Sequence, residues 1–250
     1  MEPSAVLAEV ARLGGRIDEV DEVAPGRPVV SLEFVDERVT DADLACLAGL
    51  PHLHTLGLRD TAVAGPGLVY FKELPQLRVL SLGDSPITDA GLAHLQGLAH
   101  LEVLGLNWTK VTDDGLAHLR GLTRLMRLNL GNTAVTDAGL EHLQGLTGLV
   151  SLDLMSTSVT GVGFRHLRGL TRLQYLCLWC AAVTDEGLRY IAGITSLQAV
   201  DLHWAPVTDA GLRHLDGMTH LQWLVLPFTK VTADGIRRLK EVLPQLQVDV

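Results

Sequence analysis

The chain has 250 residues and a mass of 27.0 kDa, and its 47% apolar and 20% charged residues are typical of a folded globular protein. The net charge of −9 opposes binding to nucleic acid or anionic lipid, because both require a basic surface. Mean hydropathy is +0.25, but polar residues interrupt every leucine run, so no segment of about 18 apolar residues predicts a membrane span. The start of the chain lacks the pattern of a secretory signal, and the three cysteines lack the spacing of a disulfide framework. These features predict a cytoplasmic protein.

Residues 1–38 predict an N-terminal cap made of a helix and a β-hairpin. Ser4 is a suitable N-cap for a helix that ends at Gly14. The apolar residues expected on one side of this helix are Val6, Leu7, Val10 and Leu13. Residues 16–20 and 29–34 predict two strands joined by a turn at Pro25–Gly26. The second strand would be a degenerate first repeat, because its Leu32 and Phe34 keep the register of leucines in the next repeat.

A 24-residue period divides residues 39–230 into eight complete repeats. A Val-Thr-Asp or Ile-Thr-Asp tripeptide begins at residues 39, 87, 111, 135, 183 and 207. One apolar column consists of Leu56, Leu80, Leu104, Leu128, Leu152, Leu176, Val200 and Leu224, and another of Leu58, Leu82, Leu106, Leu130, Leu154, Leu178, Leu202 and Leu226. These columns predict the core of a stacked array.

Each repeat is expected to contain one short helix and one short strand. Leu92, Leu95 and Leu98 have the spacing of one helix face, whereas Leu104 and Leu106 alternate with a glycine as in a strand. The threonine before each helix (Thr88, Thr112 or Thr136) is the expected N-cap, and the aspartate after it would meet the positive end of the same helix. The glycines expected to end the helices in a left-handed conformation are Gly97, Gly121, Gly145, Gly169, Gly193 and Gly217.

The pattern Leu53-x-x-Leu56-x-Leu58-x-x-Thr61-x-Val63 and its seven later copies resemble the leucine-rich repeat. The resemblance covers about residues 39–243 and implies an α/β fold: a right-handed, single-domain solenoid with a parallel β-sheet on its concave face and short helices on its convex face. Proteins of this family generally use the concave face to bind another protein.

The repeated Val-Thr-Asp-x-Gly-Leu segment is similar to the cysteine-containing subclass known from F-box substrate receptors. Threonine stands in place of the subclass cysteine at positions 61, 109, 133, 157 and 229, and no F-box-like segment precedes the array. A ubiquitin-ligase role is therefore not implied. Residues 231–250 predict a degenerate repeat and a C-terminal cap, in which residues 246–250 form a last edge strand.

Recognition is expected where the repeats differ, because packing sets the apolar columns. Four variable columns on the strand side contain all four tryptophans. The predicted partner-binding residues are Trp108, Asp153, Tyr175, Trp179, Asp201, His203, Trp204, Trp223 and Phe228. The aromatic members fall mainly in repeats six to eight and resemble the centre of a protein interface, while the two aspartates suggest a ligand with a cationic or hydrogen-bond-donating group. The alternative is that these rings only fill the inner face.

Two other classes of function remain open. Cys177, Asp201 and His203 would lie on adjacent strands and could form part of a thiol nucleophile or a metal site, giving an enzyme or a small-ligand binder. A structural role in self-assembly is the other alternative. The Cys177–Cys180 pair is too widely spaced for a disulfide if both residues are extended. The recurring helix-side histidines, at positions 94, 118, 142, 166 and 214, are interpreted as a consensus position rather than a metal site.

The favoured hypothesis is a protein–protein interaction module that binds a protein or peptide partner and is monomeric in isolation. The sequence indicates no enzymatic activity, no cofactor and no metal.

Overall fold

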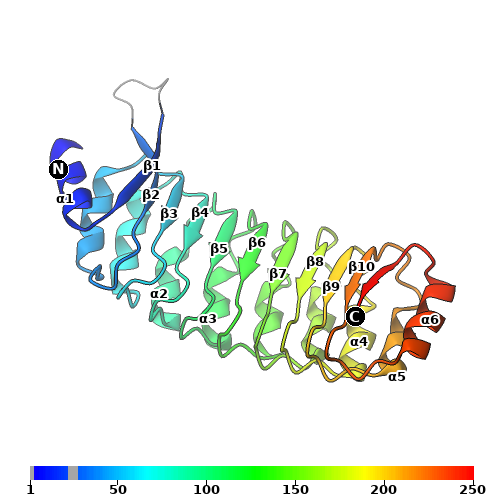
Figure 1. The fold of residues 1–250 in the computed structure, drawn as a ribbon. Coiled ribbons are helices and arrows are strands. Elements are labelled where there is room, and N and C mark those ends of the chain that lie inside the picture. The colour runs from blue at the N-terminus through cyan, green and yellow to red at the C-terminus, as the bar shows by residue number, and fades with distance from the viewer. Residues whose placement is uncertain (1–2, 22–27) are drawn as a thin grey trace. The chain divides into compact units, whose positions relative to one another are not determined.

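The structure is a computed structural model that describes residues 3–21 and 28–250, and the contacts within it divide the chain into two compact units, Met1–Leu125 and Met126–Val250. In each unit a layer of short strands packs against a layer of short helices (Figure 1). The predicted α/β solenoid class is confirmed. The predicted turn at Pro25–Gly26 lies outside the described residues.

The strands of the first unit are β1 (Arg16–Val20), β2 (Val29–Glu33), β3 (Thr55–Gly57), β4 (Val79–Ser81) and β5 (Val103–Gly105). Its helices are α1 (Pro3–Arg12), α2 (Asp89–Leu92) and α3 (Asp113–Leu116), with 3₁₀ segments η1 (Asp43–Gly49), η2 (Pro66–Glu73), η3 (Ala93–Leu95) and η4 (Ala117–Leu119). β1 and β2 form the predicted antiparallel hairpin, and β2 to β5 pair in parallel in chain order. Leu32 pairs with Leu56, so the predicted register of the degenerate repeat is confirmed.

The strands of the second unit are β6 (Arg127–Asn129), β7 (Ser151–Asp153), β8 (Tyr175–Cys177), β9 (Ala199–Asp201), β10 (Trp223–Val225) and β11 (Gln247–Asp249). Its helices are α4 (Asp185–Ile191), α5 (Asp209–Leu212) and α6 (Ala233–Val242), with 3₁₀ segments η5 (Gly139–Leu143), η6 (Val162–Leu167) and η7 (Arg213–Leu215). All six strands are parallel and pair in chain order, so the predicted last edge strand is present as β11.

The core of each unit lies between its strands and its helices. Every residue of the two predicted apolar columns is at most 3% exposed. Burial of one such leucine contributes about 1.5–3 kcal/mol, so the columns are the main source of stability. Because successive strand residues point to opposite faces, the residues flanking each buried leucine are directed outward.

The helices differ from the prediction in type and in how they end. Most are one or two turns long and wholly or partly 3₁₀, a geometry that proteins use in short pieces. Of the six predicted left-handed glycines, only Gly97 has a positive φ (98°), and the prediction is wrong for the other five. In those repeats a tight turn ends the helix without a left-handed glycine; after η4, for example, Leu122 N donates to Leu119 O at 2.9 Å while Arg120 stays right-handed.

The aspartate ladder also differs from the prediction, because the carboxylates of Asp89, Asp137, Asp185 and Asp209 bond to the following repeat rather than capping their own helices. Asp185 Oδ1 accepts a hydrogen bond from Thr208 N, and Asp185 Oδ2 accepts one from Thr208 Oγ1, both at 2.7 Å. The same pair of bonds joins Asp89 to Thr112 and Asp209 to Thr232. Backbone and hydroxyl donors of the following repeat therefore occupy these carboxylates. Thr88 and Thr112 have N-cap backbone angles but make no side-chain capping bond.

Asp137 makes the most extensive of these contacts. Its carboxylate accepts hydrogen bonds from Thr160 N (3.0 Å), Thr160 Oγ1 (2.6 Å), Gly161 N (3.0 Å) and Gly163 N (2.8 Å). Gly161 occupies the aspartate position of the Val-Thr-Asp motif. Its backbone has a φ of 108°, a conformation that glycine adopts readily and other residues rarely adopt. Thr184 N then donates to Thr160 O instead of to a carboxylate. A backbone carbonyl therefore takes the place of the missing carboxylate at this junction.

The helix α1 covers the start of the array. α1 packs on η1, with Val6 and Val10 buried, whereas Leu7 is 39% exposed and does not belong to the predicted apolar side. The reason is the helical period: Leu7 is rotated by about 100° from Val6. The helix begins at Pro3, and the predicted cap by the Ser4 side chain lies outside the described side chains.

Candidate functional site

Six ring-bearing side chains of the second unit form a surface that we call the aromatic face: Tyr175, Trp179, His203, Trp204, Trp223 and Phe228. Tyr175 and Trp223 are outward residues of β8 and β10, and the other four lie in the turns that follow β8, β9 and β10. The five larger rings are exposed, from 42% for Trp223 to 67% for Phe228, and His203 is half-buried. The alternative in which these rings pack on one another merely to fill the inner face stays a second prediction.

Four rings of the aromatic face, those of Trp179, His203, Trp204 and Phe228, contact one another. Trp204 and Phe228 are stacked, with centroids 4.4 Å apart and an interplanar angle of 9°. The His203 ring lies 5.4 Å from the Trp179 ring and 5.3 Å from the Phe228 ring. Trp223 Nε1 donates a hydrogen bond to Asp249 Oδ2 at 2.8 Å. These contacts restrict the ring rotamers before any partner binds, which lowers the entropy that binding must overcome.

Two of these aromatic residues occupy an unfavourable backbone conformation. The second residue of each turn after a strand has a positive φ of 52–62°, and these residues are Asp60, Asp84, Trp108, Asn132, Ser156, Cys180, Trp204 and Phe228. Asp and Asn tolerate this left-handed region well, whereas bulky side chains rarely adopt it. Trp204 and Phe228 therefore stand where the turn itself favours a small polar residue, and turn stability does not account for them.

A hollow of about 180 Å³ lies beside Tyr175 of the aromatic face. It is lined by Ser151, Tyr175, Leu176, Cys177, Ala199, Val200, Asp201 and Val225. Asp201 Oδ1 accepts a hydrogen bond from His203 N at 2.9 Å, and Asp153 Oδ1 accepts one from Met155 N at the same distance. Each aspartate thus uses one carboxylate oxygen to hold the turn that follows its strand.

The structure pairs Cys177 with Asp201 and bonds Asp201 to the backbone of His203, but it does not support a nucleophile there. Cys177 and Asp201 pair in register on β8 and β9. Burial raises the pKa of the Cys177 thiol to about 12, and the carboxylates of Asp153 and Asp201 add to the effect. A thiol with this pKa stays protonated near neutral pH, which opposes nucleophilic catalysis.

The Cys177–Cys180 pair forms no disulfide, and the helix-side histidines form no metal site among the described residues. Cys177 and Cys180 are both free thiols, and Cys180 lies in a left-handed turn rather than in extended chain. Within residues 3–21 and 28–250, no group of three or more His, Cys, Asp or Glu side chains has an arrangement that could hold a metal ion. His118 of the histidine column instead bonds to Gln96 of the preceding repeat at 2.8 Å.

Trp108 lies in the first unit, in the turn after β5, and is 57% exposed. Among the described residues, no other aromatic ring contacts it. Of the nine predicted partner-binding residues, the second unit therefore holds eight, and Trp108 is left out of the aromatic face. The even 24-residue period carries no signal for a division of the chain between repeats.

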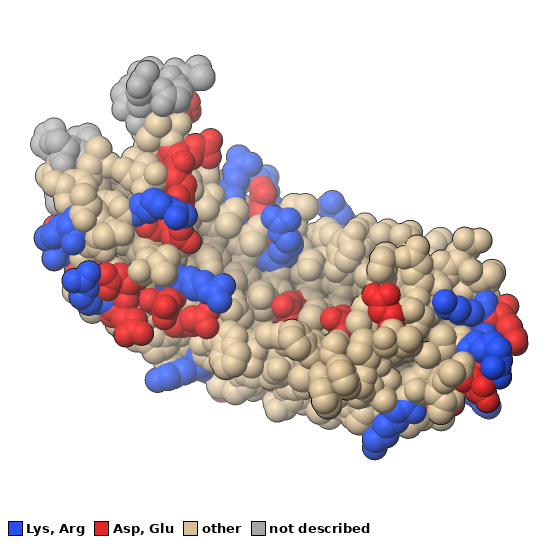
Figure 2. Space-filling model, in the orientation of Figure 1, with Lys and Arg blue, Asp and Glu red and all other residues tan. Residues whose placement is uncertain are grey.

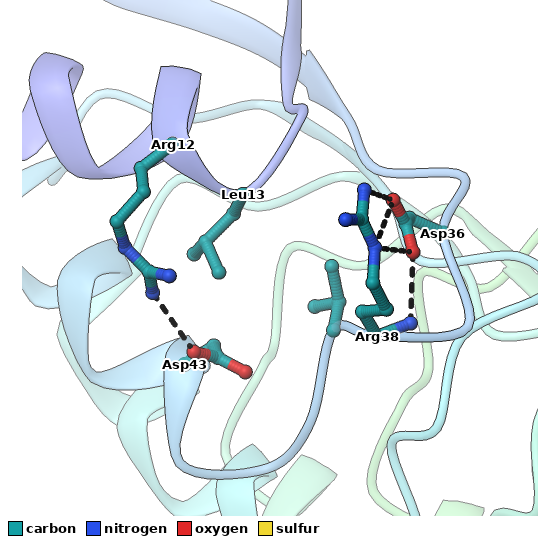
Figure 3. Close-up of a pocket in the computed structure, with 6 residues that line it drawn as sticks. Arg12, Leu13, Asp36, Arg38 and Asp43 are labelled. Atoms are coloured by element: carbon teal, nitrogen blue, oxygen red, sulfur yellow. Dashed lines mark hydrogen bonds and ion pairs between the residues drawn. The ribbon is translucent and has the colours of Figure 1, made fainter.

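A smaller hollow in the first unit, which sequence reasoning missed, has a structural explanation. Its volume is about 120 Å³, and its lining comprises Arg12, Leu13, Asp36, Arg38, Val39 and Asp43 (Figure 3). Arg12 pairs with Asp43 at 3.4 Å and Arg38 with Asp36 at 2.6 Å. The hydrogen bonds from Arg38 lower the pKa of Asp36 to about 2. Its charged groups neutralise one another in pairs. We therefore interpret this hollow as a gap in the packing between the cap helix α1 and the first repeat.

The two units differ in surface charge on the side shown in Figure 2. Lysine, arginine and acidic side chains crowd the start of the first unit, whereas most of the strand side of the second unit is uncharged, with a few acidic side chains among uncharged ones (Figure 2). No helix in the described part of the chain has both the length and the apolar character needed to span a bilayer.

Comparison with known proteins supports the fold. No protein-family model matches the sequence, and no curated protein matches it either. Among solved structures, the chain is similar to internalin C2 from Listeria monocytogenes, with a TM-score of 0.51 and 23% sequence identity over 69% of this chain and 80% of that chain. The similarity supports a leucine-rich-repeat fold. It leaves the resemblance to the cysteine-containing subclass a prediction.

Proposed function

We propose that this protein is a binding module that holds a protein or peptide partner on the strand side of its second unit, with the aromatic face as the anchor. The observation that carries the proposal is the exposure of five large rings, four of which have a ring contact or a hydrogen bond to a neighbouring side chain. Rigid Trp and Tyr side chains dominate the energetics of protein interfaces, because they bring a large contact area at a small loss of entropy.

The backbone of the turns gives separate support. Trp204 and Phe228 occupy left-handed positions that Asp60 or Asn132 fills at lower conformational cost in other repeats. Residues in unfavourable conformations persist when they serve a function that compensates for the cost. A contiguous apolar surface of this kind on a protein without a membrane-spanning helix among its described residues fits an interaction site.

The test is affinity capture from a native lysate with the wild type beside the double variant Trp179→Ala/Trp204→Ala. Each truncated anchor is expected to cost at least about 2 kcal/mol, or roughly thirtyfold in Kd, so the double variant should retain no partner. The matched control is Trp108→Ala, which removes the same residue type from the same turn position in the first unit and should retain the partner. Circular dichroism checks that the variants are folded.

Unchanged capture by the folded double variant would refute the proposal. If the captured protein is a second copy of this chain, sedimentation at several concentrations would instead show self-association that the double variant loses. In that case the alternative of a self-assembling repeat protein replaces a separate partner.

A further inference from the structure

The aromatic face is accompanied by negative charge, and Arg127, the outward cation of the adjacent strand β6, forms no ion pair with it among the described residues. The outward positions from β7 to β11 include Asp153, Asp201 and Asp249, and no lysine or arginine occurs in residues 151–156, 175–180, 199–204, 223–228 or 247–249. Among the described residues, these three carboxylates form no ion pair. Because no cation of the described chain pairs with these carboxylates, their charge is available to a partner.

The fold does not require a charge at these positions, since Asn129, Gly105 and Val225 occupy the equivalent places on β6, β5 and β10. Asn129 occupies the equivalent position at the end of β6, and its Oδ1 accepts a hydrogen bond from Gly131 N at 2.9 Å. Asp153 and Asp201 make the same bond to Met155 N and His203 N, also at 2.9 Å. Because an amide oxygen holds this turn in the same chain, turn geometry does not explain the negative charge of the two aspartates.

We infer that the partner segment bound by the aromatic face is cationic: an extended, arginine-containing peptide segment whose guanidinium groups lie against Asp153 and Asp201 and over the neighbouring rings. The inference rests on the proposed function and specifies the partner's chemistry. Arginine suits this surface better than lysine, because its planar guanidinium both pairs with a carboxylate and stacks on an aromatic ring. The hollow provides both elements, since Tyr175 and Asp201 line it together with apolar side chains.

The strand register sets the spacing of the cations. Asp153, Cys177 and Asp201 pair across three adjacent parallel strands, so the two carboxylates are two strands apart. At about 4.8 Å per strand this separation is about 10 Å. An extended segment that crosses the strands covers about 3.3 Å per residue, so two arginines three positions apart match the two aspartates. A polyproline II segment meets this condition, because it has three residues per turn and rises about 3.1 Å per residue.

The probe is a fluorescein-labelled peptide with arginine at every third position and proline between, measured by fluorescence polarisation with the full chain. The matched ligand replaces each arginine by citrulline, which keeps the shape and removes the charge. We expect the arginine peptide to bind at least about tenfold more tightly than the citrulline peptide, and its binding to weaken as salt is added. Equal binding of the two peptides, or no binding of the arginine peptide, would overturn the inference.

The protein variant is Asp153→Asn/Asp201→Asn, which keeps both turn acceptors, as Asn129 does, and removes two charges. We expect it to bind the arginine peptide roughly tenfold more weakly. The control, Glu73→Gln/Asp114→Asn, makes the same change in net charge at exposed positions of the first unit and should bind like the wild type. If both double variants bind equally, the inference fails.

The two proposals fail in distinguishable ways. Loss of the lysate partner by Trp179→Ala/Trp204→Ala, combined with its full retention by Asp153→Asn/Asp201→Asn, would leave the binding module intact and remove the cationic segment. Retention of the partner by both variants would remove the docking role of the aromatic face.

Discussion

Replacement of Asp137 by alanine tests whether the carboxylate bonds between successive repeats are a main source of stability. The carboxylate accepts four hydrogen bonds, at 2.6–3.0 Å, from Thr160, Gly161 and Gly163. Hydrogen bonds to a charged group contribute about 1.5–3 kcal/mol each when broken singly, but bonds to one carboxylate are not additive, and water can reach part of this half-buried site. We therefore expect Asp137→Ala to lower the free energy of unfolding by about 3–5 kcal/mol.

The assay is urea unfolding followed by far-ultraviolet circular dichroism, with the m-value fitted for every variant, because repeat proteins can unfold in parts. Asp137→Asn should lose about half as much free energy, since its amide keeps one acceptor oxygen. Asp234→Ala is the control: its exposed carboxylate pairs with Arg237 within α6, and its removal should cost less than about 0.5 kcal/mol. A loss below about 1 kcal/mol for Asp137→Ala, at an unchanged m-value, would refute the stabilising role of these bonds.

Two further predictions concern the turns and the acidic groups. Trp108→Asn should raise the free energy of unfolding by about 1 kcal/mol in the same assay, because asparagine tolerates the φ of 58° and the indole contacts no other aromatic ring among the described residues; a destabilised variant would contradict the cost assigned to this turn. The melting temperature should fall as the pH is lowered from about 4 toward 2. Hydrogen bonds from Thr232 lower the pKa of Asp209 below its ordinary value of 3.8, as those from Thr40 do for Asp43, so the stability from each group is present above that value and is lost as the folded form is protonated. Asp209→Asn should make the fall shallower, and an equal fall in both proteins would show that this carboxylate does not contribute.

The period allowed the core, the strand register and the outward position of the rings to be predicted, because a residue that recurs every 24 positions must occupy an equivalent place in each coil. Leu32 pairs with Leu56 for this reason, although its own repeat is degenerate. Contacts between coils could not be predicted in the same way. A repeating aspartate is equally consistent with bonds to its own helix and to the next one, and only the packing distance between coils decides that Asp185 bonds to Thr208.

The left-handed turns were missed although the sequence carried a signal for them. Asp60, Asp84 and Asn132 share one column, and these residue types favour a positive φ. The glycine column was instead assigned the left-handed role, which only Gly97 fulfils.

The regular reach of the aspartate bonds has a consequence for how such a chain can change in length. Asp89, Asp185 and Asp209 each bond to the threonine 23 residues ahead, so donor and acceptor recur with every 24-residue step. A whole unit that is duplicated or lost in register brings an equivalent threonine opposite each aspartate at the new junction. Gene rearrangement can therefore lengthen or shorten the array, or reorder its repeats and with them the outward strand residues. The aspartate–threonine hydrogen bonds between successive repeats are kept.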